Sequence, residues 1–549
     1  GYLSNNKENE EAIFDLFFRK IPNDGGYAIM AGLDKVIPYI ENLKFTEKEL
    51  DYFRRNGYSE EFIDYLKNFK FTGDIYAIAD GTPVFPNEPL ITIKAPIIEA
   101  QIVETAILSM INGAMEHATS ARRIIESTNG KVGVMEFGAR RADGSEAAID
   151  SSIYGIMAGC IGTSNIIAAD MLNIKAMGTM AHSFIESFPN EYEAFLAYAK
   201  AYPDNCILLV DTVDTLKSGV INAIRVFRYM KENNMPLDHI GIRIDSGDLA
   251  YLSKEARKML DAAGFPQAKI CLSNGLNAET IESLFNQGAK FDSLGVGDNI
   301  SKPNGRMGCV YKEVALIDEK GNVIPKIKLS NDTVKIVNPD YKKLYRAYSK
   351  STGYALADIM CRKNEETNER ELTIVSTIDP LKKNTITDFE LVELQKPKFK
   401  NGKLDFSDQV RVNCKIRENL FVKNGDVLIC VRNGSKKLLG KSAYIENLVE
   451  PMTFGAFMAI CRSDIGKYIY LWMQSDNYLQ QIAKLGTTMS INQLTQKMLM
   501  NLEIPIPDIT TQQQIISKIK ELEKQIAEAQ TIIDNSKQQK QEILDKYLK

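Results

Sequence analysis

One histidine lies among small and hydroxyl side chains in the segment MGTMAHSFIESF, which runs from Met177 to Phe188. It is His182, and the whole chain has only two others, His117 and His239. An imidazole in such surroundings can transfer a proton or form a covalent bond, because its ring nitrogens act as bases and nucleophiles near neutral pH. The alternative is a structural histidine that caps the end of a strand.

Further polar residues follow short apolar runs between residues 131 and 298: Glu136, Arg140, Asp211, Asp214, Lys217, Arg243, Asp245, Asp248, Asn274 and Asp298. Turns such as SGD, SNG and GVG can cradle phosphate oxygens with their backbone N–H groups. Cations would hold phosphates, while carboxylates would hold Mg²⁺ or sugar hydroxyls. The mixture suits a polyphosphate substrate, although each residue alone also fits a turn, a helix cap or a solvated surface. The chain contains no P-loop motif.

The elements that must position these groups form a repeating pattern between Lys131 and Gly297. The apolar runs are KVGVMEFG, IKAMGTMAH, CILLVDTVD, IGIRIDSGD, AKICLSNG and FDSLGVG. Helical patterns such as SKEARKMLDAAG separate them. Alternation of strand, turn and helix predicts parallel strands with helical crossovers, and this many units favours an α/β barrel. Catalytic groups are then expected at the carboxyl ends of the strands.

The whole chain divides into four predicted regions. Residues 1–115 are expected to form an α+β domain that residues 305–398 complete, and residues 116–304 the barrel. Residues 399–507 are expected to form a small α+β region, and residues 508–549 a long helix. In that helix Ile519, Leu522, Ile526, Ala529 and Ile533 have the 3,4 spacing of a coiled-coil seam.

Composition is that of a globular protein, with 44% hydrophobic and 25% charged residues among 549. The sequence holds no apolar run near the roughly 20 residues that cross a bilayer, so no membrane association is expected. The eight cysteines never form a Cys-x-x-Cys pair, which argues against a zinc site or disulfides and favours a reducing, cytoplasmic location. Residues 396–549 carry a net charge of +7 and residues 1–395 of −11, which suggests two different modules.

Residues 2–398 resemble the nicotinate phosphoribosyltransferase family. The similarity rests on EFGARRADG, GTSN, GTMAHSF, YPDNCILLVDTVDTLKSG, GIRIDSGDLAYLSKEARKMLD and GVGD. It implies an α/β barrel with a flanking β-rich domain, in a homodimer with active sites at the subunit boundary. The implied reaction joins nicotinate to phosphoribosyl pyrophosphate, with coupled ATP hydrolysis, and yields nicotinate mononucleotide and pyrophosphate. Mg²⁺ is the implied cofactor and ATP the co-substrate.

The resemblance also implies roles for single residues. Phe137 would stack on the nicotinate ring and Arg140 would hold phosphate or carboxylate. Ser164 would favour nicotinate, because relatives that use nicotinamide place an Asp there. His182 matches the histidine that the family phosphorylates, with Asp211 expected to orient it. The phosphoribosyl group would contact Arg243 and Asp245, the 5′-phosphate would contact Asn274, Gly275, Gly295 and Gly297, and Mg²⁺ would contact Asp211 and Asp245.

A different class of function stays open, that of a DNA-binding or partner-binding protein with an inactive barrel. The family's chain normally begins with a further helix, whose Tyr stacks on the ring, and the present sequence starts after that helix. We expect nicotinate to bind more weakly without it. The complete set of site residues favours the enzyme.

The segments from residue 400 onward resemble part of a type I restriction–modification specificity subunit. The similarity rests on VKNGDVLICVRNGSKKLLGKSAYI and on IPIPDITTQQQIISKI before the final helix. It implies a partial target-recognition domain and one coiled-coil spacer helix. The candidate DNA contacts are Arg432, Asn433, Lys436, Lys437 and Lys441. We expect weak DNA binding, with the helix pairing with a second copy or with a methyltransferase-type partner.

Overall fold

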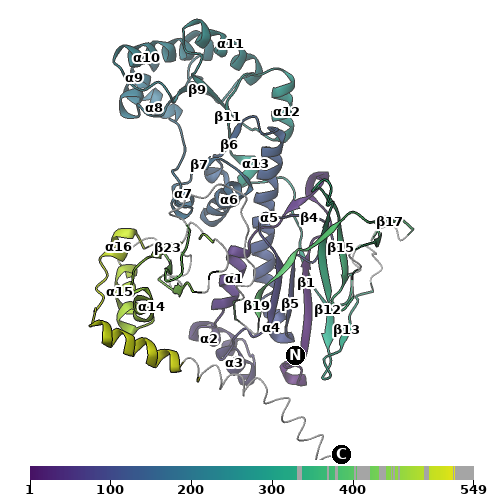
Figure 1. Ribbon diagram of the computed structural model, residues 1–549. Helices are drawn as coiled ribbons and strands as arrows, with labels where there is room; N and C mark the ends of the chain where they lie inside the picture. The colour runs from purple at the N-terminus through teal and green to yellow at the C-terminus, as the bar shows by residue number, and fades with distance from the viewer. Residues whose placement is uncertain are drawn as a thin grey trace, which may run out of the picture. The chain divides into compact units, whose positions relative to one another are not determined.

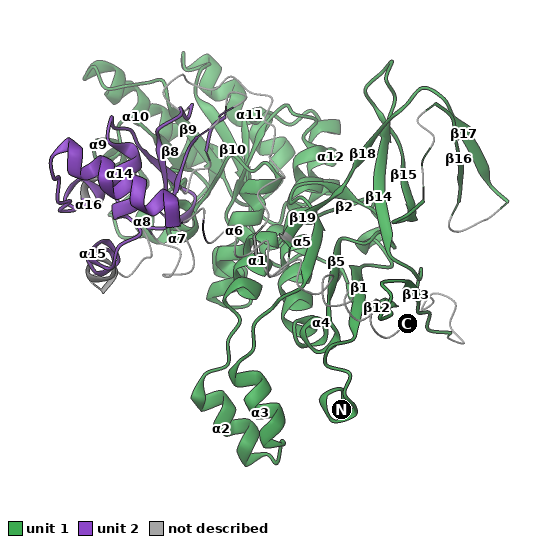
Figure 2. Ribbon diagram, turned by 60° about the horizontal axis from the view of Figure 1, so that its bottom comes forward, with its two compact units in different colours: residues 1–170, 174–410 green, residues 171–173, 411–549 purple. Residues whose placement is uncertain are grey.

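The computed structural model describes residues 1–329, 337–365, 367, 370–376, 381–400, 403–404, 421–431, 440–446, 448, 452–454, 458–487, 494–522 and 525. The chain divides into two compact units (Figure 2). Unit 1 comprises residues 1–170 and 174–410, and unit 2 comprises residues 171–173 and 411–549. The change of charge near residue 396 therefore lies close to the end of unit 1.

The first part of unit 1 is a seven-stranded sheet in the order β13-β12-β1-β5-β3-β19-β20. Its strands are β1 (Glu11–Phe17), β3 (Asp74–Ile78), β5 (Ile91–Pro96), β12 (Val310–Ile317), β13 (Val323–Pro325), β19 (Gln395–Lys400) and β20 (Lys403–Leu404). β1 pairs antiparallel with β5 on one side and β12 on the other, and six of its seven residues are buried. The buried Asp15 in this strand is matched by the Lys342 ammonium at 2.9 Å.

Helices cover this sheet and connect it to the second sheet of unit 1. They are α1 (Leu33–Asn42), α2 (Glu47–Arg55), α3 (Glu60–Lys67), α4 (Ile97–Ile102) and α5 (Glu104–Ser127). α2 begins where the sequence supplies a capping box, since Thr46 and Glu49 bond each other's backbone N–H groups. The 24-residue α5 runs beside the first sheet (Figure 1).

The second part of unit 1 is a six-stranded parallel sheet in the order β7-β6-β11-β10-β9-β8. Its strands are β6 (Gly133–Glu136), β7 (Gly162–Thr163), β8 (Cys206–Leu209), β9 (Ile240–Ile244), β10 (Lys269–Ser273) and β11 (Ser293–Val296). The crossover helices are α6 (Ser145–Ala158), α7 (Ile166–Met171), α8 (His182–Glu186), α9 (Glu191–Ala201), α10 (Val220–Glu232), α11 (Leu249–Ala262), α12 (Ala278–Asn286) and α13 (Asp298–Ser301). Ile242, Ile270, Leu272 and Val296 are fully buried between sheet and helices.

The predicted barrel is a half-barrel, because β7 and β8 lie at the two ends of the strand order. The predicted strand IKAMGTMAH is wrong, since residues 174–181 contain no strand. The Met177 N–H group instead donates to the Thr163 carbonyl at 2.8 Å. A Cβ atom on Gly162 would lie 2.2 Å from the Met177 sulfur, so the segment packs closely against β7. Two residues of β7 therefore occupy the sheet position next to β6.

Smaller sheets complete unit 1. They are formed by β14 (Lys342–Tyr348) with β15 (Ala355–Arg362) and β18 (Glu390–Glu393), by β16 (Leu372–Val375) with β17 (Lys383–Ile386), and by β2 (Ala28–Ile29) with β4 (Pro83–Val84). Residues 305–398 were expected to complete the N-terminal domain, and β12, β13 and β19 do lie in the first sheet. β15 does not join it, because it pairs with β14 in a separate sheet.

Unit 2 has a small sheet and several helices. The elements are β21 (Val427–Cys430), β22 (Ser442–Tyr444), β23 (Met458–Cys461), α14 (Gly466–Trp472), α15 (Asp476–Thr487), α16 (Gln496–Met500) and a helix over residues 509–522. Val427, Trp472 and Tyr478 are at the centre of its core. Of the predicted seam, Ile519 and Leu522 lie in the described helix, where Leu522 is 56% exposed. Ile526, Ala529 and Ile533 lie outside the described residues.

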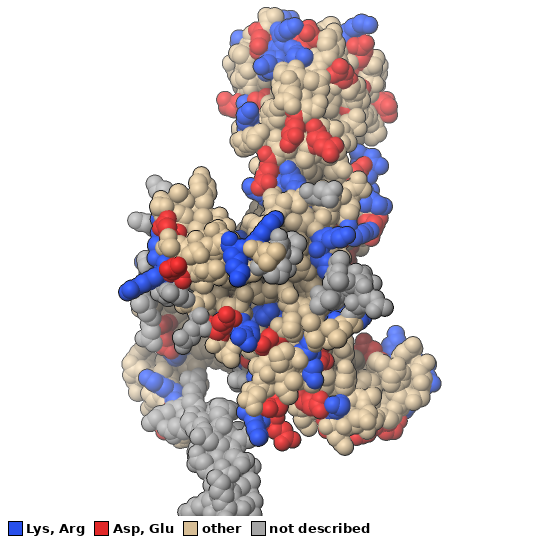
Figure 3. Space-filling view, turned by 90° about the vertical axis from the view of Figure 1, so that its right-hand side faces the viewer, with Lys and Arg blue, Asp and Glu red and all other residues tan. Residues whose placement is uncertain are grey.

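Surface charge is mixed over the face drawn in Figure 3, where basic and acidic side chains alternate. Neither sign gathers there into a broad patch. Within the described part of the chain, no helix combines the length and the apolar character needed to cross a membrane.

Candidate active site

Polar side chains converge at the carboxyl edge of the parallel sheet. The register aligns Leu209 with Arg243, Arg243 with Cys271, and Ser273 with Gly295. Because the strands are parallel, the residues that follow these positions lie along one edge. The structure places there most of the strand-end residues that the sequence predicts: Glu136, Ser164, Asp211, Arg243, Asp245, Asn274 and Gly297.

Arg243 is held by three neighbours. Its Nη2 lies 3.0 Å from Asp245 Oδ1, its Nε donates to Ser273 Oγ at 2.8 Å, and its Nη1 donates to Thr179 Oγ1 at 2.9 Å. The side chain is only 15% exposed. These contacts use three of the five guanidinium N–H groups, which leaves two for a bound anion.

His182 is the first residue of α8. Its Nδ1 lies 3.0 Å from the Thr212 hydroxyl, and its Nε2 lies 3.9 Å from Asp245 Oδ2. The side chain is 42% exposed, so a ligand can reach Nε2. Asp211 was expected to orient the imidazole, but the structure gives this contact to Thr212. Thr212 follows Asp211 directly, and neighbouring side chains in an extended segment point in opposite directions.

Asp211 has a different set of contacts. Its Oδ2 accepts a hydrogen bond from the Ser246 hydroxyl at 2.5 Å. Its Oδ1 is buried and has no hydrogen-bond partner in the structure. A buried unpaired oxygen is costly, so this atom is a suitable ligand for a cation. Among the described residues no group of three or more His, Cys, Asp or Glu side chains could hold a metal alone. Mg²⁺ characteristically uses only one or two carboxylates together with substrate phosphates, and the unpaired Asp211 Oδ1 could be one of them.

Phe137 lies in the turn after β6, beside the Arg243 guanidinium, whose carbon is 5.7 Å from the ring centroid. A Cβ atom on Gly295 would lie 2.6 Å from this ring, so only glycine allows the close approach. Arg140 lies in the following 3₁₀ turn (Ala139–Arg141) and is exposed. Its neighbour Arg141 pairs with Asp298 at 3.0 Å.

Ser164 directly follows β7 and is exposed. Its backbone N–H donates to the Glu136 carbonyl at 3.0 Å, which ties it to the residue before Phe137. The structure therefore brings Ser164 and Phe137, the two residues predicted to recognise nicotinate, to the ends of adjacent strands.

The predicted phosphate-binding residues form turns after β10 and β11. Asn274 and Gly275 both have positive φ angles, of 97° and 61°. The Asn299 amide donates to the Leu276 carbonyl at 2.8 Å, which connects the first turn to α13. Gly297 immediately precedes α13. Open backbone N–H groups at such turns suit a phosphate.

Sequence reasoning missed the hydroxyl groups that hold the charged side chains. They are Thr179, Thr212, Ser246 and Ser273. Each lies next to, or a few residues from, a predicted site residue in GTM, DTV, DSG or LSN. Such hydroxyls are also common in ordinary turns, so their type alone gives no signal.

Buried cysteines add no nucleophile to this edge. Cys160, Cys206, Cys271 and Cys309 are buried, as the sequence predicts for small apolar residues. Burial raises the pKa of the Cys160 and Cys206 thiols to about 12, which keeps them protonated.

Comparison with known proteins agrees with this geometry. Three family models match the chain: the nicotinate phosphoribosyltransferase N-terminal domain over residues 1–112, the family itself over 132–335, and the C-terminal domain over 341–418. Nicotinate phosphoribosyltransferase from Bacillus subtilis is 41% identical over 411 residues, covering 74% of this chain and 83% of the relative. The chain belongs to the nicotinate phosphoribosyltransferase family.

Other relatives support the same assignment. Nicotinate phosphoribosyltransferase from Caenorhabditis elegans is 33% identical over 467 residues, covering 74% of this chain and 82% of the relative. The fold is similar to the crystal structure of human nicotinic acid phosphoribosyltransferase, with a TM-score of 0.65 and 23% identity. That match covers 75% of this chain and 89% of the human chain. The family's C-terminal domain model continues to residue 418, past the expected end of the resemblance at Lys398.

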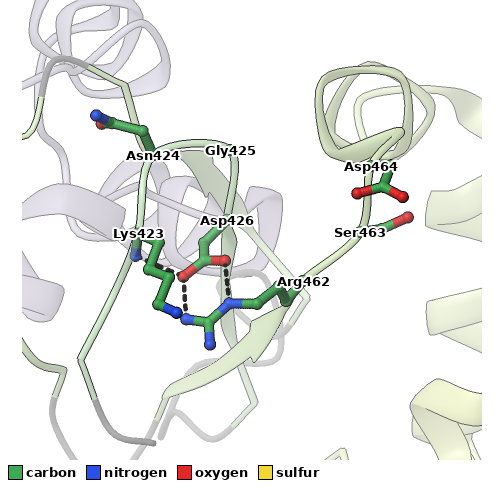
Figure 4. Close-up of a pocket in the computed structure, with 7 residues that line it drawn as sticks. All are labelled: Lys423, Asn424, Gly425, Asp426, Arg462, Ser463 and Asp464. Carbon is green, nitrogen blue, oxygen red and sulfur yellow. Dashed lines mark hydrogen bonds and ion pairs between the residues drawn. The ribbon is translucent and has the colours of Figure 1, made fainter. Parts of the chain in front are cut away.

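The predicted DNA contacts of unit 2 lie mostly outside the described residues, namely Arg432, Asn433, Lys436 and Lys437. Lys441 is described and exposed. Unit 2 also has a pocket of about 390 Å³ between the β21 and β23 ends (Figure 4). At its centre Arg462 donates twice to Asp426, at 2.7 Å each, which lowers the pKa of this carboxyl. The charge of Arg462 is therefore matched within the protein.

Proposed function

We propose that unit 1 transfers the phosphoribosyl group of phosphoribosyl pyrophosphate to nicotinate, with coupled ATP hydrolysis. The products are nicotinate mononucleotide and pyrophosphate, with ADP and phosphate from ATP. Family membership supports the reaction class, and the observation that carries the proposal is the arrangement of His182, Asp245 and Arg243 at one edge of the sheet. This arrangement places a cation, a carboxylate and a nucleophilic ring within a few ångströms of one another.

Substrate recognition follows from the surrounding residues. Phe137 stacks on the nicotinate ring, Arg140 binds an anionic group, and Ser164 leaves room for the nicotinate carboxylate. The anchored Arg243 binds phosphate oxygens, and Asp245 accepts hydrogen bonds from the ribose. The turns at Asn274, Gly275, Gly295 and Gly297 hold the 5′-phosphate through backbone N–H groups.

The chemical step breaks the bond between ribose C1 and the pyrophosphate oxygen, while the nicotinate nitrogen forms a bond to C1. Charge separates in this step, so catalysis consists mainly of positioning and of charge stabilisation. Mg²⁺, held by Asp211 and Asp245, would neutralise the pyrophosphate leaving group. Arg243 contributes positive charge at the same place.

His182 links the reaction to ATP. Contact of Nδ1 with Thr212 leaves Nε2 as the nitrogen that attacks the γ-phosphoryl group of ATP, with ADP as the leaving group. A phosphoryl group on Nε2 adds negative charge and acceptor oxygens beside Asp211 and Asp245. It would strengthen metal binding and organise the departing pyrophosphate.

The test is product formation by the full chain. With phosphoribosyl pyrophosphate and nicotinate, the chain should form nicotinate mononucleotide and pyrophosphate, faster with ATP than without it. With nicotinamide in place of nicotinate, it should form nicotinamide mononucleotide far more slowly. Arg243→Ala should lose activity. Arg228→Ala, which removes an exposed arginine outside the site, is the control and should keep it. Absence of product from the wild-type chain with either nicotinate or nicotinamide, both with and without ATP, would instead favour an inactive barrel in a binding protein.

We also propose an assembly for the chain and a role for unit 2. The family resemblance supports a homodimer, and the sequence of unit 2 supports a type I restriction specificity-like fragment. Its net charge is modest, so binding to duplex DNA should be weak and should fall steeply with added salt. Fluorescence anisotropy of a labelled duplex at increasing salt concentrations tests this expectation. Tight binding of one duplex sequence at physiological salt would overturn it.

A further inference from the structure

Glu136 is a completely buried carboxylate at the end of β6, with 0% exposure. It accepts hydrogen bonds from the Gly138 backbone N–H, from the Ser152 hydroxyl at 2.8 Å and from the Thr163 hydroxyl at 2.6 Å. A buried carboxylate is costly unless such donors surround it. None of the roles assigned above to side chains uses this group, so its place in the fold needs another explanation.

The three donors come from three different elements. Gly138 lies in the turn that carries Phe137, Ser152 lies in α6, and Thr163 is the last residue of β7. The Thr163 hydroxyl also accepts from the Asn165 N–H at 3.0 Å. In the sequence, Phe137 lies between two residues of this network, Glu136 and Gly138. Ser164 lies between two others, Thr163 and Asn165.

Backbone contacts tighten the same arrangement. The Ser164 N–H donates to the Glu136 carbonyl at 3.0 Å, and the Phe137 N–H donates to the Val296 carbonyl at 2.7 Å. A Cβ atom on Gly138 would lie 2.5 Å from Ser301 Oγ and 2.6 Å from the Gly297 carbonyl, so the turn has no room to shift toward α13. The carboxylate adds side-chain contacts to β7 and α6, and its loss would leave only the backbone contacts to hold the turn against β7.

We infer that Glu136 is a positioning residue that fixes the relative placement of Phe137 and Ser164, and therefore the geometry of nicotinate recognition. The inference rests on the proposed function, since it assigns the ring contact to Phe137 and the carboxylate side to Ser164. Glu136 itself touches no substrate. Its effect reaches the ligand through the turn after β6 and the end of β7.

A purely structural role makes a different prediction. A carboxylate that only stabilises the fold would change the melting temperature and leave the KM values of the remaining folded protein unchanged. A positioning residue changes KM for nicotinate and changes KM for phosphoribosyl pyrophosphate much less, because polar contacts hold Arg243 and Asp245 in addition to the Phe137 ring beside Arg243.

Four variants separate these outcomes. Glu136→Ala removes all three contacts and should raise KM for nicotinate at least tenfold, with KM for phosphoribosyl pyrophosphate within twofold of wild type. Glu136→Gln keeps the shape and one oxygen for the Gly138 N–H, so it should recover most of the loss. Thr163→Val removes the donor beside Ser164 and should raise KM for nicotinate severalfold. Ser152→Ala removes the donor on α6 and should have the smallest effect.

Steady-state kinetics, with nicotinate affinity measured by calorimetry, provide the readout. The inference is overturned if folded Glu136→Ala or Thr163→Val protein has the wild-type KM for nicotinate, or if both KM values rise together. If Glu136→Ala fails to fold, the KM values of Thr163→Val and Glu136→Gln for nicotinate test the inference in its place. An inactive wild-type enzyme would contradict the proposed function instead, and nicotinate affinity by calorimetry would still test Glu136.

Discussion

The Arg243 guanidinium is anchored by Thr179, Ser273 and Asp245 before any ligand arrives. An anchored side chain loses little rotamer freedom when it binds an anion, so more of the interaction energy contributes to affinity. Arg140 is exposed on a short turn, so binding of an anion is expected to restrict more of its rotamer freedom. The two arginines are therefore expected to contribute unequally, with Arg243 the more important for phosphoribosyl binding.

Sequence reasoning identified the charged residues of the site but not their local partners. Charged residues after apolar runs stand out, because they end strands that would otherwise continue. Thr179 and Thr212 have no such signal, and the network around Glu136 joins residues 2, 16 and 27 positions apart. Contacts over such distances depend on the fold, which single residues do not reveal.

The identity of residue 164 should set the choice between nicotinate and nicotinamide. Ser164→Asp places a negative charge beside the expected position of the nicotinate carboxylate, which repels the acid and can accept a hydrogen bond from the amide. We expect kcat/KM for nicotinate to fall at least tenfold and the preference to shift toward nicotinamide. Ser164→Asn adds similar volume without charge and serves as the control. Equal losses in both variants would point to volume and not charge.

Among the elements, β6, β8, β9, β10 and β11 match apolar runs that the sequence predicts. β7 was missed because Gly162–Thr163 is too short to produce a periodic pattern. The run IKAMGTMAH has alternating apolar residues but packs across β7 through Met177. Whether a sheet closes into a barrel depends on contacts between strands that are far apart in the sequence. The local alternation of strands and helices therefore predicted a barrel where the sheet is a half-barrel.

The start of α1 should make stability depend on pH. Asp80 accepts from the Leu33 N–H at 3.1 Å, and burial raises the pKa of this carboxyl to about 7. The folded state therefore binds the proton more tightly than the unfolded chain, so the free energy of unfolding decreases as pH rises from about 4 to about 7. Asp80→Asn should remove this part of the slope.

Urea unfolding of both proteins between pH 4 and pH 8 measures the difference. The exposed Asp64→Asn is the matched control and should follow the wild type. Identical pH profiles for wild type and Asp80→Asn would show that burial at Asp80 does not couple folding to proton binding.

At the scale of the whole molecule, the boundary of the enzyme lies later than the sequence indicated. β19 extends to Lys400 and pairs with both β3 and β20. A chain cut after Lys398 would lose the end of a strand in the seven-stranded sheet. The unit boundary after Val410 keeps that sheet complete.

Removal of residues 411–549 should leave an active enzyme. We expect residues 1–410 to keep kcat within about threefold of the full chain, because every predicted site residue of the enzyme lies in unit 1. A cut after Lys398 should lower the melting temperature. Calorimetry, activity and light scattering compare the three proteins. A smaller subunit number for residues 1–410 would show that the C-terminal helix associates, and an inactive 1–410 protein would show that unit 2 is needed for catalysis.

The most direct test of ATP-coupled phosphoribosyl transfer measures nicotinate mononucleotide and ADP formed together by the full chain, for the wild type and for His182→Ala. The wild type is expected to form both products, with synthesis accelerated by ATP. His182→Ala should keep slow synthesis, form no ADP and show no response to ATP. Undiminished ATP coupling in His182→Ala would contradict the phosphohistidine role, and absence of nicotinate mononucleotide from the wild type would contradict phosphoribosyl transfer to nicotinate by unit 1.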